Sequence, residues 1–344
     1  MLRVCTRICT LVVVCVLAPW WSVQSFRTTS FKPVRMRRAG QPPLAASRQR
    51  EGTVEFDSGD CFYRPHSKII RDMGVLALRV LPQQRLNGAR ARNHSGDGGG
   101  GAGELDGRGI SVLDAMCGSG IRALRYIEEG GARYVVANDA DDDTQLANAR
   151  AANLGKHIVA GSVALQCGDA MDAYFAARLE RSYYDMIDAD GFGSGMPHSA
   201  EAWWALRLGG LLYLCSTDAR TAAGKNSAAA AWRGFGAVAQ SMPSSNELGV
   251  RLLVADAVRQ AAARGMEAVP VFGVYHRPSS CARVMMRLVA AGRHSCPSSA
   301  EKSMGFAAYC ALTGEHWILS LSDIHDPRAA AVCPPAAQHA SLEI

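Results

Sequence analysis

The chain has 344 residues, of which 48% are hydrophobic and 20% are charged. This composition excludes a disordered chain and provides enough apolar residues for one large domain with appendages. The formal net charge of +6 arises in the N-terminal segment, because residues 1–50 hold nine of the 37 Lys and Arg residues and no acid. The rest has 28 basic residues against 31 acidic ones, a net charge of −3. Bulk charge therefore does not predict RNA binding by the body of the protein, and any RNA contact there must come from a local patch.

The 11 cysteines are scattered along the chain, and no CxxC pair occurs. This spacing indicates neither a zinc ribbon nor a thioredoxin-type site. A disulfide framework is not expected in a chain of this length with a full apolar core. We expect most of the cysteines to be small buried hydrophobic residues.

The N-terminus has the features of a targeting segment. Arg3 and Arg7 precede an apolar stretch, residues 8–18, that is too short to span a membrane, and residues 23–25 offer a small-residue cleavage site. Residues 26–50 are rich in Arg, Ser and Thr and lack acids, as organelle transit peptides do. The combination resembles the bipartite presequence of algae with complex plastids. We therefore expect residues 1–50 to direct import into an organelle, a plastid in the first place, with a mitochondrion, secretion or a membrane anchor as alternatives.

The next segment precedes the first strand of the main predicted fold. An aromatic pair at residues 62–63 and the pair Arg71-Asp72 stand ahead of an apolar run that predicts a helix, residues 73–80. These residues suggest a lid or a carboxylate clamp, and a solvated helix start explains Arg71-Asp72 as well. Residues 86–109 have low complexity and contain four consecutive glycines, so we expect a flexible surface insertion there.

Residues 111–140, SVLDAMCGSGIRALRYIEEGGARYVVANDA, carry the clearest pattern. An apolar run ends at Asp114, and a tight turn with Gly118 and Gly120 follows. An amphipathic stretch and a second apolar run then lead to Asp139. This order of strand, glycine turn, helix, strand and acid is typical of a nucleotide-binding βαβ unit, with the second acid placed to bind a ribose hydroxyl. Glycines suit the turn because a residue without Cβ lets the backbone approach a ligand closely.

The turn differs from that of dinucleotide-binding folds. Those folds use a third glycine in register to hold a pyrophosphate, and a carboxylate such as Asp114 repels a diphosphate. The same carboxylate can accept hydrogen bonds from a cationic, amine-bearing ligand such as S-adenosylmethionine. The pattern therefore predicts a methyltransferase site, with a site for another nucleotide and a purely structural turn as alternatives.

Two further predicted strands also end in acids. Residues 162–166 form the first and are followed by Asp169-Ala170, where an acid could accept a hydrogen bond from an adenine amine. Residues 184–187 form the second and run into residues 188–194, DADGFGS. Because ligands of open α/β sheets lie beyond the carboxyl ends of the strands, we expect the four acids to face one crevice. These acids are Asp114, Asp139, Asp169 and Asp190.

The Asp190 loop is the candidate for chemistry. An exocyclic base amine is a poor nucleophile because its lone pair is delocalised into the ring. A carboxylate at Asp190 accepting one N–H, and the carbonyl of Gly191 accepting the other, would hold the lone pair toward a methyl sulfonium. Phe192 would stack on the base. The alternative is a turn that only caps a strand.

The region beyond this loop has weaker patterns. An amphipathic helix carries Glu247 and Arg251 at i, i+4, a spacing that predicts a surface ion pair rather than a site. Residues 269–275 and 282–289 alternate as sheet strands do.

Taken together, these motifs resemble the tRNA (guanine-26) dimethyltransferase family of class I S-adenosylmethionine enzymes, over about residues 51–310. No single motif is decisive, but their order is specific. The matching pieces are Glu51-Gly52, Phe62-Tyr63-x-Pro65, Arg71-Asp72, Asp114-Ala115, residues 120–126, Asn138-Asp139, Asp185-x-Ile187-Asp188-x-Asp190, Gly193-Ser194, Thr217-Asp218, Gly224, Glu247-x-x-x-Arg251 and Arg283-Val284.

The resemblance implies S-adenosylmethionine as cofactor and tRNA as partner. It also implies that Arg71, Arg122, Asp139, Asp169 and Ala170 hold the cofactor, and that Asp190 serves the target guanine. With the residues of the turn included, the predicted cofactor-binding set is Arg71, Asp114, Gly118, Gly120, Arg122, Asp139, Asp169 and Ala170. The predicted catalytic set is Asp190, Gly191 and Phe192.

Three departures from the family pattern have consequences. Residues 190–193 read Asp-Gly-Phe-Gly where the family has Asp-Pro-Tyr-Gly, and loss of the proline loosens the loop. Arg64 replaces an asparagine. The family often carries paired cysteines in its C-terminal region, whereas Cys310 is followed by Thr313 where the second would fall. We therefore expect no zinc and a weaker grip on tRNA by this region.

We expect a Rossmann-like class I methyltransferase sheet over residues 51–240 and a smaller α+β, tRNA-binding domain over residues 241–344. The expected reaction is methyl transfer from S-adenosylmethionine to the exocyclic amine of guanosine 26 in tRNA, in one or two rounds. The alternatives are methylation of another amine or amide, such as a protein glutamine, and a catalytically weak tRNA-binding protein. No metal is expected, and no membrane contact once the targeting segment is removed.

Overall fold

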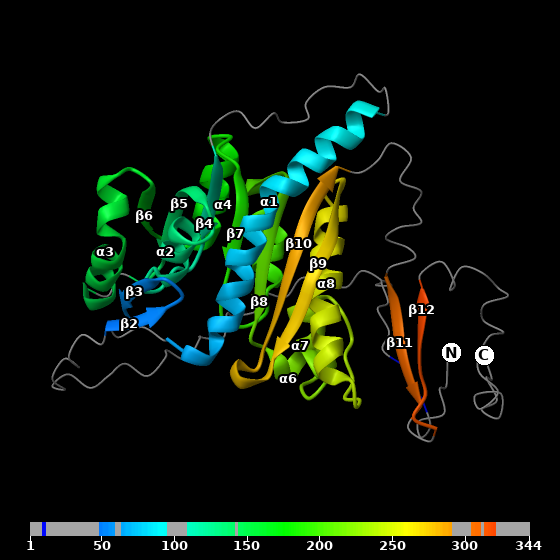
Figure 1. Cartoon of the computed structure of the whole chain (residues 1–344). Helices are drawn as coiled ribbons and strands as arrows, with labels where there is room; N and C mark the ends of the chain where they lie inside the picture. The colour runs from blue at the N-terminus through cyan, green and yellow to red at the C-terminus, as the bar shows by residue number, and fades with distance from the viewer. Residues whose placement is uncertain are drawn as a thin grey trace, which may run out of the picture.

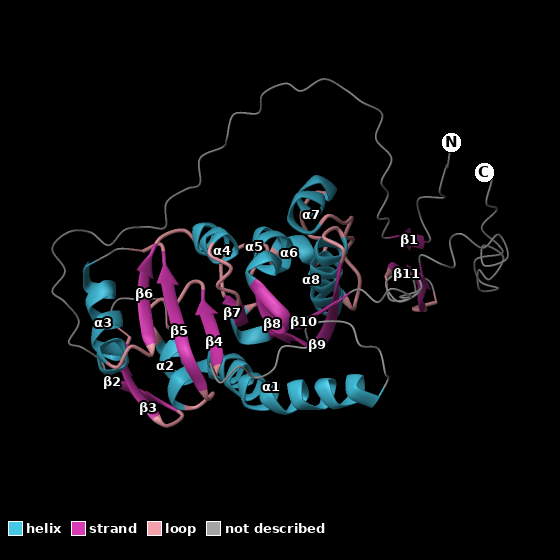
Figure 2. Ribbon diagram, turned by 90° about the horizontal axis from the view of Figure 1, so that it is seen from above, coloured by secondary structure: helices cyan, strands magenta, loops and turns pink. Residues whose placement is uncertain are grey.

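The computed structural model of the chain describes residues 9–11, 48–58, 63–94, 109–141, 144–290, 304–310 and 313–320. A central sheet with helices on both faces forms the main body (Figures 1 and 2). Among the helices of these residues, none is both long enough and apolar enough to cross a membrane.

Seven strands form the central sheet, in the order β6-β5-β4-β7-β8-β10-β9. The first five of these are parallel, whereas β10 runs antiparallel to both β8 and β9. The chain steps outward in one direction from β4 to β6 and in the other from β7, so the order reverses between β4 and β7, where open α/β sheets bind ligands. The strands are β4 (Ile110–Asp114), β5 (Ala132–Asp139), β6 (Val163–Cys167), β7 (Tyr184–Ala189), β8 (Leu206–Ser216), β9 (Met266–His276) and β10 (Cys281–Ala290).

Helices cover the two faces of this sheet. Alternate strand residues point to opposite faces: Val112 and Met186 pack in a cluster with α1, α2 and α3, whereas Leu113 and Ile187 pack in a cluster with α4, η2 and α8. Because both faces are covered, the central strands are apolar runs rather than alternating ones. The helices are α1 (Lys68–His94), α2 (Ile121–Glu128), α3 (Thr144–Val159), α4 (Ala170–Leu179), α5 (Met196–Glu201), α6 (Ala219–Ala222), α7 (Ala228–Phe235) and α8 (Ser245–Ala262), with the short 3-10 helices η1 (Pro65–Ser67), η2 (Ala202–Ala205) and η3 (Arg277–Ser279).

The structure differs from two expectations about the organisation of the chain. Helix α1 continues to His94, into the segment where a flexible insertion is expected from residue 86, and residues 95–108 of that segment lie outside the described residues. Strands β9 and β10 join the same sheet as β4 to β8. The domain boundary expected at residue 240 therefore falls within this unit, which continues to Ala290.

Two smaller sheets complete the described chain. The hairpin of β2 (Arg48–Glu51) and β3 (Val54–Asp57) precedes α1. Strands β1 (Cys9–Leu11), β11 (Gly305–Cys310) and β12 (His316–Ser320) form a three-stranded sheet. Three residues of the predicted targeting segment thus pair with β11, and residues 1–8 and 12–47 lie outside the described residues.

Candidate functional site

Four acids lie at the carboxyl ends of the neighbouring strands β6, β5, β4 and β7. Asp114 and Asp139 are the last residues of β4 and β5, Asp169 follows β6, and Asp190 follows β7. The parallel register places Asp114 opposite Asp188 of β7. This arrangement confirms that the four acidic strand ends share one edge of the sheet, beside the point where the strand order reverses.

The turn after β4 contains two glycines, Gly118 and Gly120, and the surroundings of the two differ. Both have positive φ, +55° for Gly118 and +82° for Gly120, which favours glycine at each. A Cβ at Gly120 would lie 2.9 Å from Leu154 Cδ1, so this glycine allows α2 and α3 to pack closely. A Cβ at Gly118 would meet nothing within 4 Å. The space beside Gly118 is therefore open to a ligand.

Asp139 connects the end of β5 to this turn. Its carboxylate accepts hydrogen bonds from Gly118 N at 2.6 Å and from Asp141 N at 2.9 Å. Arg150 of α3 lies 3.7 Å from Asp139 and donates from Nε to Gly118 O at 2.8 Å. The Asp139 side chain is 14% exposed, so part of the carboxylate reaches the surface beside the open space.

Arg122, in the first turn of α2, joins the turn to the end of β4. Its Nε donates to Asp114 Oδ1 at 3.3 Å, and its Nη2 donates to Met116 O. Asp114 is completely buried. Burial and the nearby charge of Asp188, opposed by Arg122, raise the pKa of Asp114 to about 7. Asp114 thus lies behind the turn and holds Arg122 in place, and its contact with a cofactor stays a prediction.

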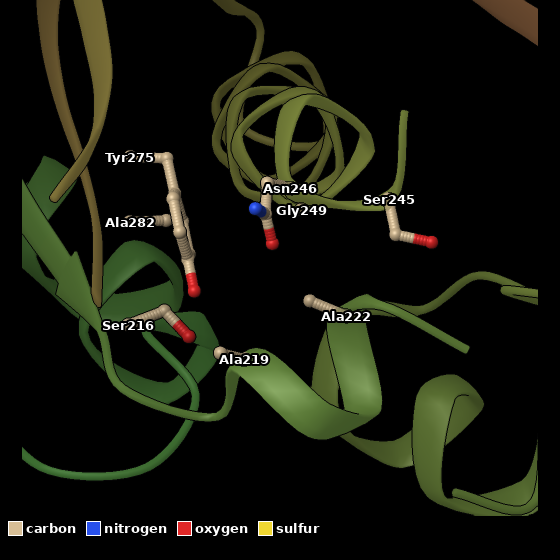
Figure 3. A pocket seen from close by; sticks show the side chains of 8 residues that line it. All are labelled: Ser216, Ala219, Ala222, Ser245, Asn246, Gly249, Tyr275 and Ala282. Carbon is tan, nitrogen blue, oxygen red and sulfur yellow. The ribbon is translucent and has the colours of Figure 1, made fainter. Parts of the chain in front are cut away.

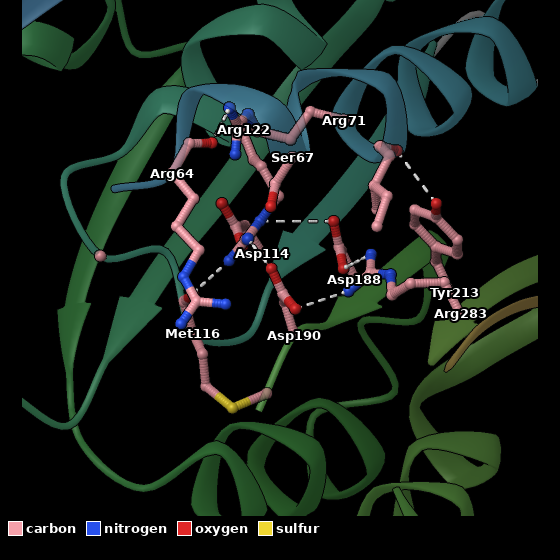
Figure 4. A network of polar contacts seen from close by, with 12 residues as sticks. Arg64, Ser67, Arg71, Asp114, Met116, Arg122, Asp188, Asp190, Tyr213 and Arg283 are labelled. Carbon is pink, nitrogen blue, oxygen red and sulfur yellow. Dashed lines mark hydrogen bonds and ion pairs between the residues drawn. The ribbon is translucent and has the colours of Figure 1, made fainter. Parts of the chain in front are cut away.

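Two arginines hold the carboxylate of Asp190. Arg122 Nη1 donates to Oδ2, and Arg283 Nη1 lies 2.8 Å from Oδ1 (Figure 4). Burial raises the pKa of Asp190, but the charges of Arg122 and Arg283 outweigh it and hold the pKa well below its usual range. The side chain is still 31% exposed. Asp190 is therefore a fixed, ionised hydrogen-bond acceptor at the surface of the site.

Below Asp190, the network is buried. Arg283 is 1% exposed, donates from Nη2 to Asp188 Oδ1 at 2.8 Å and stacks 3.7 Å from the ring centre of Tyr213. Tyr126 also donates to Asp188. Three carboxylates thus share two guanidinium groups. Of the three, Asp114 has the raised pKa, first because it is completely buried and second because the Asp188 and Asp190 charges lie nearby.

Arg71 reaches the same region from α1. It donates from Nε to Glu51 Oε1 at 2.8 Å and from Nη2 to both Glu51 Oε2 at 2.5 Å and Arg64 O at 3.2 Å. Tyr63 also donates to Glu51, which is buried. The charge of Arg71 contributes to the low pKa of Asp190. The structure places Arg71 beside the site in a fixed orientation, and its predicted contact with the cofactor is untested.

The loop after β7 carries the remaining predicted catalytic residues. The Phe192 ring is 76% exposed, as a residue that stacks on an incoming base would need to be. Gly191 does not have a positive φ. A Cβ at Gly191 would lie 3.0 Å from both His198 Nε2 and Met116 Sδ. The space at residue 191, rather than backbone conformation, therefore favours glycine.

The end of β8 anchors this loop. Gly193 N donates to Thr217 Oγ1 at 2.8 Å, and Ser216 Oγ donates to Gly193 O at 3.1 Å.

A cavity of about 10 Å³ lies beside Ser216 (Figure 3) and has room for about one water molecule. It is too small to hold a nucleobase. Its lining residues are Ser216, Ala219, Ala222, Ser245, Asn246, Gly249, Tyr275 and Ala282.

Asp169 and Ala170 form the start of α4. Asp169 is the N-cap and accepts a hydrogen bond from Met171 N at 2.8 Å, whereas Ala170 is buried. The structure therefore gives Asp169 a capping role. A contact of this exposed carboxylate with an adenine amine stays a prediction.

Three residues that hold the candidate site together, Glu51, Asp188 and Arg283, are absent from the set predicted from sequence. All three belong to the motifs that match the family, but none of them is in the predicted site. The signal was present for Arg283, because a charged residue within an apolar run, residues 281–290, must find a partner when the strand is buried. Its partners could not be inferred without the order of the strands.

Comparison with protein families places these features in context. Residues 45–325 match the family model described as N2,N2-dimethylguanosine tRNA methyltransferase. The chain is 28% identical over 275 residues to the tRNA (guanine(26)-N(2))-dimethyltransferase of Aeropyrum pernix, covering 79% of this chain and 61% of that protein. It is 31% identical over 247 residues to the enzyme of the same description from Pyrobaculum islandicum, covering 68% and 61%.

The chain aligns with only part of the length of its relatives. The tRNA (guanine(26)-N(2))-dimethyltransferase of Metallosphaera sedula is 26% identical over 228 residues, which cover 66% of this chain and 50% of that protein. The chain thus spans about half to three fifths of the length of these curated relatives. A solved structure of Trm1 from Pyrococcus horikoshii with S-adenosyl-L-methionine aligns with a TM-score of 0.61 and 21% identity, covering 79% of this chain and 68% of that one. This alignment confirms the predicted class I methyltransferase fold.

Proposed function

Because the chain belongs to the N2,N2-dimethylguanosine tRNA methyltransferase family, we propose that it methylates the exocyclic amine of guanosine 26 in tRNA, in one or two rounds, with S-adenosylmethionine as methyl donor. The observation that carries the proposal is the Asp190 carboxylate, whose two oxygens are held by Arg122 and Arg283. This carboxylate stands one strand away from the glycine turn of β4.

The residues at the ends of β4, β5 and β6 fit the cofactor. The open space beside Gly118 would receive the cofactor, because no protein atom lies within 4 Å of a Cβ built there. Asp139 would accept hydrogen bonds from the ribose hydroxyls, and Asp169 one from the adenine amine. When bound, S-adenosylmethionine supplies the methyl group carried on its sulfonium.

Asp190 would orient the target amine. The lone pair of a guanine amine is delocalised into the ring, so the amine attacks only when its N–H groups are held away from the line of attack. The ionised carboxylate of Asp190 would accept one N–H and the Gly191 carbonyl the other, while the exposed Phe192 ring stacks on the base.

The two arginines beside Asp190 suit it to orient the amine rather than to accept the proton that the amine loses. Arg122 and Arg283 lower the pKa of Asp190, and a carboxylate with so low a pKa is a weak proton acceptor near neutral pH. We therefore propose that Asp190 positions the amine and that the proton released by methylation passes to solvent.

The experiment that tests the function uses a matched pair of tRNA transcripts. The full chain is incubated with methyl-labelled S-adenosylmethionine and a tRNA carrying either guanosine or inosine at position 26, and the nucleosides are separated by mass spectrometry. Inosine differs from guanosine by the absence of the exocyclic amine. We expect N2-methylated guanosine from the first tRNA and no product from the second. Equal labelling of both tRNAs, or labelling of neither, would contradict the proposal.

We also propose that residues 1–50 direct the protein to an organelle, a plastid in the first place. The support is the sequence of this segment, with nine basic residues, no acid and a short apolar core. Fusion of residues 1–50 to a fluorescent protein tests the proposal, with the same fusion lacking residues 1–25 as control. We expect plastid fluorescence from the first and not from the second; a secreted or mitochondrial signal would support an alternative destination.

A further inference from the structure

Two short helices distant in sequence meet at the edge of the sheet that carries Asp190. Strand β10 runs antiparallel to β8, with Ala282 opposite Ser216, so the loop before β10 lies level with the carboxyl end of β8. This loop contains η3 (Arg277–Ser279). Helix η1 (Pro65–Ser67), which leads into α1, contacts it.

Side chains hold η1 and η3 together. Ser67 Oγ and Ser279 Oγ are 2.7 Å apart, and His276 Nδ1 is 2.9 Å from Ser279 Oγ. The rings of His66 and His276 stack with their centres 5.9 Å apart and their planes 20° from parallel. The two helices therefore form one surface.

Two arginines and two histidines lie on this surface. Burial and the neighbouring His66 lower the pKa of His276, so the positive charge comes mainly from the arginines. We name Arg64, His66, His276 and Arg277 the basic rim. His66 and Arg277 are exposed, and among the described residues neither forms an ion pair with a carboxylate. Because the chain beyond residue 50 has a net charge of −3, such a local group is the kind of patch that an RNA contact requires.

The basic rim is connected to the site through Arg71. The Arg64 carbonyl accepts a hydrogen bond from Arg71 Nη2, and the charge of Arg71 acts on Asp190. Figure 4 shows Arg64 and Ser67 in the same region of the molecule as Asp114 and Asp190. A nucleotide held at Asp190 would thus have its neighbouring phosphates close to η1 and η3.

We propose that the basic rim binds the tRNA phosphates that flank the target guanosine. Arginine binds phosphate with charge-assisted hydrogen bonds, and each such contact releases counterions, so affinity falls steeply with salt. The proposal rests on the proposed tRNA substrate but assigns a binding surface to the catalytic unit itself, independently of the C-terminal region.

The test measures tRNA binding by the full chain without cofactor, by fluorescence anisotropy over a series of salt concentrations. The variants are Arg277→Gln and His66→Gln. Arg181→Gln is the matched control, because Arg181 is also exposed but lies before β7, at the opposite edge of the sheet. The nine basic residues of the N-terminal segment are common to all of these proteins.

We expect Arg277→Gln to weaken tRNA binding by about 3- to 10-fold at low salt and to reduce the slope of log affinity against log salt by about 1. We expect a smaller loss of affinity for His66→Gln, and no change in tRNA affinity or methylation rate for Arg181→Gln. Wild-type affinity and salt slope in Arg277→Gln and His66→Gln would overturn the proposal. If the two variants bind tRNA as the wild type does and all three proteins methylate it, the result refutes the basic rim and leaves the proposed function standing. If the wild type itself methylates no tRNA, the result refutes the proposed function.

Discussion

Arg283 Nη1 lies 2.8 Å from Asp190 Oδ1, although Arg283 is on β10 and Asp190 directly follows β7, and these two strands are not neighbours in the sheet. Arg283 also pairs with Asp188 at 2.8 Å and is 1% exposed. A cation from beyond residue 240 therefore fixes the acid that is proposed to hold the target amine.

The buried pairing of Arg283 predicts a large effect on stability. Arg283→Met keeps much of the side-chain volume but removes the nearer of the two cations of buried Asp188, leaving only Arg122 at 3.4 Å. We therefore expect the free energy of unfolding to fall by about 3–5 kcal/mol. Urea denaturation measures this change. The matched control is Arg251→Met, since Arg251 forms an exposed i, i+4 pair with Glu247 and should cost no more than about 0.5 kcal/mol. Equal losses in the two variants would show that the buried pair has no special role.

The raised pKa of Asp114 predicts a pH-dependent stability. The folded protein keeps the Asp114 proton up to about pH 7 because of burial and Asp188, whereas the unfolded chain releases it near the usual value of about 3.9. The folded state thus binds more protons in this window, and this contribution to stability is lost as pH rises through it.

Asp114→Asn imitates the protonated acid and removes that titration. Between about pH 4 and 7 we expect the free energy of unfolding of the wild type to fall relative to the variant, by up to about 1.4 kcal/mol per pH unit, and above about pH 7 we expect the difference to level off. Urea denaturation at several pH values measures the difference, with Asp172→Asn, an exposed acid of α4, as control. A constant difference between wild type and Asp114→Asn would show that Asp114 is ionised throughout.

The position of Asp139 predicts its effect on cofactor binding. Loss of its hydrogen bonds to the ribose should weaken S-adenosylmethionine binding by about 1–3 kcal/mol in Asp139→Ala. Calorimetry measures the affinity, and Asp172→Ala should bind as the wild type does. Because Asp139 also accepts a hydrogen bond from Gly118 N, circular dichroism must show an intact fold. Unchanged affinity in Asp139→Ala would remove this residue from the site.

Much of the sheet and of the edge that holds the site could be predicted from sequence. Residues 111–140 contain β4, α2 and β5 in the expected order, because hydrophobic periodicity and the glycine turn are local signals. Helix α1 is longer than predicted, and the run Ala-Arg-Ala-Arg at residues 89–92 favours helix despite the low complexity of the segment.

The contacts among charged side chains could not be predicted in the same way. The pairing of Asp190 with Arg122 and Arg283 depends on the order of β4, β7, β8 and β10 in the sheet, and no local pattern encodes that order. The burial of Asp114 behind the turn depends on the same packing. Sequence therefore identified the acids but not which of them are held by which cations.

The space at Gly191 predicts how the loop responds to the family proline. Any Cβ at this position meets His198 Nε2 and Met116 Sδ at 3.0 Å, so Gly191→Pro alone should gain little activity. Removal of the imidazole in Gly191→Pro with His198→Ala should raise methyl transfer above that of Gly191→Pro. Single-turnover rates of the wild type, both single variants and the double variant form the cycle. Additive effects would show that His198 does not restrict residue 191.

The central claim is that the Asp190 carboxylate holds the target amine, and single-turnover methylation of tRNA by Asp190→Asn tests it most directly. The variant keeps the size of the side chain but loses the charge that accepts the amine N–H. We predict a rate about 10²-fold below that of the wild type, because the amine is no longer held in line with the methyl group, with S-adenosylmethionine affinity nearly unchanged by calorimetry. A variant that methylates guanosine 26 at the wild-type rate would contradict the account.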